Sequence, residues 1–177
     1  PRPISPGVPR TPSTTSSGLA RAALLVLVGA WLGLLFASWA VASATFRTAE
    51  LVAGAPAGSA AGDRVALVAA DSRRPLFRHL ASEVNRWMFG RFGWAQLALS
   101  LVVVVLAWPL GGAVRWLSLL GLAAVAVQGA ALGPAILELG RSIDFVARPL
   151  APDVGRRFGL LHGGYVLLHL VKATALL

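Results

Sequence analysis

The sequence has no cysteine, a single tyrosine and only seven acidic residues among 177. Without cysteine, the chain cannot form disulfides, iron–sulfur clusters or cysteine-ligated zinc sites. The shortage of acids leaves a net charge of +9. A basic chain can bind nucleic acid, but 56% hydrophobic residues beside 13% charged ones are too apolar for a soluble domain of this length. We therefore interpret the arginines as loop residues beside anionic lipid, and predict no nucleic-acid partner.

Recognisable catalytic motifs are also missing from the sequence. It contains no Gly-rich phosphate loop, no His-Glu-x-x-His, no nucleophile elbow and no paired carboxylates within an apolar run. Serine, histidine and aspartate all occur, but no spacing among them indicates a catalytic triad. We predict a protein that is not an enzyme and that has no catalytic residues.

Long apolar runs are what the sequence does contain. Each is close to the roughly 20 residues that cross a hydrocarbon core as a helix. They predict an all-α integral membrane protein, a four-helix bundle with spans at about 19–45, 93–110, 113–136 and 158–177. The first run also resembles a signal peptide, because Ala42-Ser43-Ala44 could be a cleavage site. Its apolar part is longer than the usual 7–15 residues, which favours a retained span.

Two further segments flank these spans. Residues 1–18 are rich in Pro, Ser and Thr and contain no acid, so we expect a disordered tail before a membrane domain of residues 19–177. Residues 76–92 are amphipathic: Leu80 and Trp87 lie on an apolar face, and Arg78 lies on the opposite, basic one. This pattern predicts a helix lying in the membrane interface, with a soluble cap packed on the loops as the alternative.

The distribution of basic residues predicts an orientation in the membrane. Lys and Arg number seven in residues 47–92 and four in residues 137–157, so eleven of the sixteen lie on one side of a four-span protein. The positive-inside rule then places both long loops in the cytoplasm and both termini outside. We expect a multi-pass protein of the cell membrane.

Small residues at four-residue spacing predict where helices approach closely. Gly29 and Gly33 form one such pair in the first span, and Gly129 and Gly133 form another in the third. Such pairs allow two membrane helices to pack backbone against backbone. Pro134 should kink or loosen the third span near its end.

The last span carries a polar stripe. At 100° per residue its polar side chains fall within an arc of about 80°; they are His162, Tyr165, His169 and Lys172. Polar groups at membrane depth face a bundle interior or a cavity. We expect this stripe to meet Gln96 and Gln128, the deeply placed amides of the second and third spans.

Two interpretations of the stripe remain open. The side chains could hydrogen-bond within the bundle as packing elements, or they could form a proton or ion path. A path lacks a carboxylate inside any span, and Lys172 could instead extend toward the headgroups. The packing interpretation is therefore favoured.

No cofactor or metal site is predicted from the histidines. His162 and His169 are seven residues apart, a rise of about 10.5 Å along one helix, so they cannot ligate one haem iron from opposite faces. Copper or zinc would need His162 together with His79 and a carboxylate such as Glu83. No ligand spacing supports that combination.

Several segments together resemble a known family. They are WLGLLFASWAVASATFR (31–47), EVNRWMFGRFGWAQL (83–97), Gly133-Pro134 and RRFGLLHGGYVLLHLVK (156–172). Across residues 19–177 the chain is similar to the transmembrane-protein-205-like family of small four-helix bacterial membrane proteins. Where members often have proline at the end of the first span, this chain has Ser43 or Ala44. The resemblance implies a four-helix domain of a bacterial inner membrane and no settled activity.

The functional expectation is accordingly broad. We expect a non-enzymatic scaffold, assembly factor or accessory subunit of a membrane complex, in contact with lipid and with a protein partner or a second copy. The alternative is a small transporter, or a protein that handles protons or metal, built on the stripe of the last span.

Overall fold

The computed structural model describes residues 14–146 and 148–176. Within them the chain forms only helices and short connections, which confirms the all-α prediction for this part. The elements are α1 (Thr14–Ala53), α2 (Ala60–Val65), α3 (Ala70–Ala107), η1 (Trp108–Leu110), α4 (Gly112–Val127), η2 (Gln128–Leu132), α5 (Gly133–Ser142) and α6 (Pro152–Leu176). Of the predicted tail, residues 1–13 lie outside the described residues, and residues 14–18 belong to α1.

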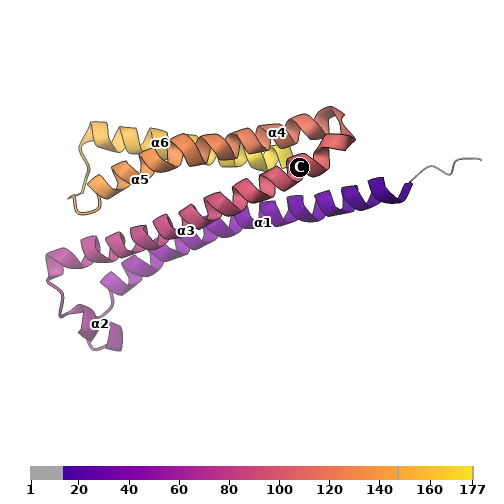
Figure 1. Cartoon of the computed structure of the whole chain (residues 1–177). Helices are drawn as coiled ribbons and strands as arrows, with labels where there is room; N and C mark the ends of the chain where they lie inside the picture. Colours follow the sequence, from indigo (N-terminus) through magenta and orange to yellow (C-terminus); the bar gives the residue numbers. More distant parts are fainter. Residues whose placement is uncertain (1–13, 147, 177) are drawn as a thin grey trace, which may run out of the picture.

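The long helices form two antiparallel pairs (Figure 1). α1 lies along α3, and the continuous helix of α4, η2 and α5 lies along α6, while α3 and α4 join the pairs. The reversal between α3 and α4 needs two residues in the left-handed region, Gly111 (φ 66°) and Gly112 (φ 53°), where a side chain would be strained. α6 also contacts α1, so the two pairs touch both through α3 with α4 and through α1 with α6.

Three of these helices are long and apolar enough to cross a membrane: Gly18–Ala53, Ala70–Leu110 and Gly112–Ser142. The fourth predicted span, at 158–177, lies in α6 as far as Leu176, but this helix does not reach the same mean hydropathy. Three strongly hydrophilic side chains lower the mean hydropathy of this 25-residue helix: His162, His169 and Lys172. By composition, the described part therefore contains three clear candidate spans, not the expected four.

The amphipathic segment 76–92 is not a separate helix. It is the first half of α3, which continues through Gly90 and Gly93 to Ala107 without a break. Asn85 is buried and Arg86 nearly so, whereas Leu80, Val84 and Trp87 are exposed. A straight helix cannot lie in the interface with one half and run through the bundle with the other. The polar side of this segment faces inward, not toward water as expected.

The apolar core is centred on Trp31 of α1, which is fully buried with Leu35, Val103 and Val125. A β-carbon added at Gly121 of α4 would lie 3.2 Å from the Trp31 ring, so this glycine is where two helices approach closely. The predicted packing glycines differ. A β-carbon at Gly29, Gly33 or Gly129 would meet no other described atom within 4 Å.

The prediction that Gly29, Gly33 and Gly129 pack against a neighbouring helix is thus wrong for the contacts within this chain. Four-residue spacing shows only that a helix has a smooth side, and here those sides face outward. Position 121, which lacks a small partner at that spacing, receives the largest side chain of the core instead.

Candidate functional site

A polar network lies inside the bundle and connects three helices. Lys172 of α6 has no exposed surface. Its Nζ donates to Oε1 of Gln96 on α3 and to Oε1 of Gln128 at the start of η2, each at 2.5 Å. The Gln128 Nε2 in turn donates to the backbone carbonyl of Tyr165 at 2.8 Å. We call Lys172, Gln96 and Gln128 the Lys172 network.

A π-helical turn places Gln128. η2 runs Gln128–Leu132, and the N–H of Gly133 donates to the Gln128 carbonyl five residues earlier. Pro134 follows directly; its ring cannot donate and crowds the carbonyl four residues back, so a widened turn relieves the helix. A β-carbon at Gly133 would lie 2.9 Å from that Gln128 oxygen. Gly133 therefore serves its own helix and not a contact between helices, while the predicted disturbance by Pro134 takes the form of this turn.

The remaining members of the predicted stripe lie progressively nearer the surface. Tyr165 and His169 are half-buried with ring centroids 4.9 Å apart, and the Tyr165 ring meets Phe89 edge-on at 6.2 Å. His162 is exposed and stacks on Phe158 at 5.9 Å.

Of the four stripe residues, only Lys172 is fully enclosed. The expectation that His162 faces the interior is wrong, because an arc of about 80° is wider than the strip of α6 that the other helices cover. The alternative in which Lys172 extends to the headgroups is also wrong, since the Gln oxygens hold its ammonium inside.

A second polar cluster fastens the segment after α5 to the first half of α3. The Asp144 carboxylate accepts from Arg86 at Oδ1 (2.8 Å) and lies 2.8 Å from His79 Nδ1 at Oδ2. Arg86 also donates to Glu83. The Phe145 ring lies against the His79 ring at 4.7 Å. We call His79, Glu83, Arg86 and Asp144 the Asp144 cluster.

The Asp144 cluster has the donor types of a metal site. Ligand atoms of His79, Glu83 and Asp144 lie within 4.8 Å of one another, and imidazole with carboxylates suits zinc. However, the Arg86 guanidinium, with a side chain only 11% exposed, donates to both carboxylates and offsets their charge. A metal would have to displace it. The cluster is therefore complete as an ion-pair network.

The sequence pattern indicated His79 and Glu83 only in combination with His162, which lies elsewhere on α6. The same pattern gave no indication that Asp144 and Arg86 are their partners. Asp144 stands just beyond a helix end, where no periodicity places it, and only the docking of that segment on α3 brings it to Arg86.

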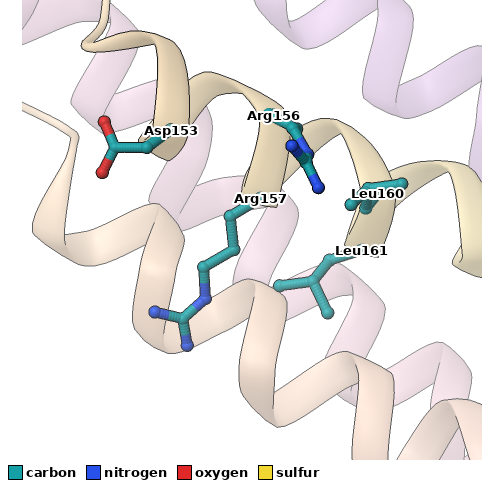
Figure 2. Close-up of a pocket in the computed structure, with 5 residues that line it drawn as sticks. All are labelled: Asp153, Arg156, Arg157, Leu160 and Leu161. Atoms are coloured by element: carbon teal, nitrogen blue, oxygen red, sulfur yellow. The ribbon is translucent and has the colours of Figure 1, made fainter.

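Two surface hollows lie at this end of the molecule. One is lined from the start of α3 and from the segment after α5, by Asp71, Arg74, Pro75, Arg78, Asp144, Phe145, Val146 and Arg148. The other lies on the first turns of α6, and Asp153, Arg156, Arg157, Leu160 and Leu161 line it (Figure 2). Both are arginine-rich and lie outside the Lys172 network.

No protein-family model, curated protein or solved structure matches the chain.

Proposed function

We propose that the chain is a multi-pass membrane protein in which α6 is embedded with the three apolar helices, and that it acts as a scaffold or accessory subunit. Two contacts between tryptophan and arginine support this placement, each marking one boundary of the membrane. The Arg91 guanidinium lies 5.4 Å from the Trp87 ring at one level, and that of Arg115 lies 5.2 Å from the Trp108 ring at another. Tryptophan with arginine is typical of membrane boundaries.

The separation of these anchors supports the placement. Trp87 and Trp108 are 21 residues apart (108 − 87) along one nearly continuous helix. At 1.5 Å per residue this is about 32 Å, close to the hydrocarbon thickness of roughly 30 Å. Between them α3 exposes Leu101, Val102 and Val105, as a lipid-facing surface does. The resemblance to the transmembrane-protein-205-like family agrees with this placement and remains a prediction.

In this frame the Lys172 network lies near the middle of the membrane. Gln96 is nine residues (96 − 87), or about 14 Å, from Trp87, and twelve residues (108 − 96), or about 18 Å, from Trp108. An ionisable group at that depth is costly unless it is paired inside the protein. Here the ammonium has two amide acceptors, and one of those amides also bonds a helix carbonyl.

The hydrogen bonds of the Lys172 network favour a scaffold over a transporter. The Lys172 ammonium and the Gln128 amide both have partners on other helices, so moving α6 would break three hydrogen bonds in an apolar medium. That favours a bundle with one fixed arrangement, as a scaffold needs, over one that alternates between two. The exposed sides of Gly29 and Gly33 are then available for a protein partner or a second copy.

The test is reconstitution into sealed vesicles. We expect no proton, zinc or copper flux from the wild-type protein, and equal leak from a Lys172→Met variant. We also expect a complex of fixed stoichiometry, with another protein or a second copy, when native membranes are crosslinked and dissolved in mild detergent. A flux that Lys172→Met abolishes would refute the scaffold and support the transporter alternative.

A second candidate function, metal handling, is favoured by the donor set of the Asp144 cluster. Titration with zinc decides it: binding that His79→Ala removes and His162→Ala leaves unchanged would support this candidate.

For orientation we retain the proposal that the arginine-rich end is cytoplasmic. A cysteine introduced at Ser59, in the connection before α2, should then resist an impermeant thiol reagent on intact cells.

A further inference from the structure

We propose that Arg156 and Arg157 bind the phosphate of one anionic phospholipid, with Leu160 and Leu161 against the start of its acyl chains. The inference rests on the membrane placement proposed above. It assigns a ligand to the hollow on α6, which is separate from both the Lys172 network and the Asp144 cluster.

The hollow has the two-part chemistry of a phospholipid. Leu160 and Leu161 follow Arg156 and Arg157 by four residues each, so each leucine lies about one helical turn below its arginine. Figure 2 shows the four side chains on successive turns around one open space, with the Asp153 carboxylate apart from both guanidinium groups. Charge at the top and apolar surface below is what a phosphate above acyl chains requires.

The depth of these residues fits the headgroup region. α3 and α6 run in the same direction, because Phe89 meets Tyr165 and, seven residues later on both helices, Gln96 meets Lys172. Arg157 precedes Lys172 by 15 residues, or about 22 Å, whereas Trp87 precedes Gln96 by about 14 Å. Arg157 thus lies six residues (15 − 9), or about 9 Å, beyond the Trp87 boundary, at the outer side of the headgroup region, where a long side chain reaches a phosphate.

The same count places Leu161 at the edge of the hydrocarbon. It precedes Lys172 by 11 residues, which is two residues (11 − 9), or about 3 Å, beyond the Trp87 level. A lipid in the adjacent leaflet therefore presents its phosphate to the arginines and its first methylene groups to the leucines. A free phosphate would use only the arginines.

The two arginines are available for an anion. Among the described residues, neither has a carboxylate within 4.0 Å, whereas Arg78 pairs with Glu50 and Arg86 with Asp144. Both are exposed, so a lipid can reach them. A guanidinium group can donate two parallel N–H bonds to one phosphate, which gives a short and directional contact.

The experiment uses the full chain in mild detergent, titrated with a fluorescent phosphatidylglycerol and with phosphatidylcholine. Arg156→Gln with Arg157→Gln should weaken phosphatidylglycerol binding by about tenfold or more, since several charge-assisted hydrogen bonds are lost. The matched control, Arg141→Gln with Arg148→Gln, removes the same charge at the same end of the molecule and should change binding by less than about twofold. Helical circular dichroism and the melting temperature check that both variants fold.

Three outcomes overturn the inference: equal losses in the two double variants, equal affinity for both lipids, or full displacement of the lipid by inorganic phosphate. The first would show attraction by net charge alone, and the last an anion site that does not recognise lipid. Leu160→Ser with Leu161→Ser should weaken lipid binding and leave any phosphate binding unchanged. Extraction of the protein from membranes by alkaline carbonate would instead refute the membrane placement, so the two failures are distinguishable.

Discussion

Replacing Gln96 by leucine is the sharpest perturbation of the interior. Leucine is close in volume to glutamine, so the change removes one acceptor of the Lys172 ammonium and leaves little cavity. Gln128 then remains as its one side-chain acceptor among the described residues. Hydrogen bonds to charged groups contribute about 1.5–3 kcal/mol, and those between membrane helices often about 1–2 kcal/mol. We expect a loss of about 2 kcal/mol.

The assay is thermal unfolding in detergent, followed by circular dichroism. For a chain of this size about 2 kcal/mol corresponds to a melting temperature lower by about 4–8 °C. Ser100→Ala is the matched control: Ser100 is also buried on α3, but its hydroxyl donates only to the Leu97 carbonyl of its own helix. We expect it to lower the melting temperature by less than about 2 °C.

A double-mutant cycle separates the hydrogen bond from general damage. In Lys172→Met, Gln96 loses its donor, so adding Gln96→Leu should then cost less than it does in the wild-type protein. A coupling energy of about 1 kcal/mol or more is expected for groups in direct contact. Strict additivity, or a Gln96→Leu variant as stable as Ser100→Ala, would refute the network.

Three other substitutions test the remaining contacts. Asp144→Asn should detach the segment after α5 and speed proteolysis there, because it weakens the ion pair with Arg86 and the contact with His79. Asp153 pairs with no described residue, so Asp153→Asn should not have this effect. Gly133→Ala should destabilise the protein by about 1–3 kcal/mol, since its β-carbon would lie 2.9 Å from a backbone oxygen, whereas Gly129→Ala should be tolerated. Trp31→Ala should cost about 3–5 kcal/mol in chemical denaturation, because it empties the centre of the core; a near-neutral result would misplace the core.

The polar residues of the interior could be predicted as a group, because amides and an ammonium stand out in apolar runs. Which of them meet could not. The pairing of Lys172 with Gln96 and Gln128 depends on the axial offset between α6 and its neighbours and on the π-helical turn at Gln128. Neither is encoded in the periodicity of one helix, so the wheel placed His162 and Lys172 in one polar arc of about 80° although one is exposed and the other enclosed.

The predicted boundary between the amphipathic segment 76–92 and the span 93–110 was wrong for a related reason. Around Gly90 the pattern changes from amphipathic to uniformly apolar, which predicts the end of one helix and the start of another. Backbone hydrogen bonds continue through such a change when no proline or cap interrupts them, so α3 is one helix of 38 residues. The change reports a new environment for the side chains and not a new element.

The π-helical turn has a consequence for how this chain can change during evolution. A π turn holds one residue more than the α-helix needs, and that residue can be deleted without breaking the helix. Removal of Ala130 would restore the regular α-helical turn and leave the residues after it at nearly their present rotation relative to α4, because the π turn absorbs the extra residue. Gly140 would still lie beside Arg86, and Asp144 beside His79. Relatives that lack this one residue should therefore keep the Asp144 cluster, and an alignment gap at 129–132 would mark the loss of the π turn alone.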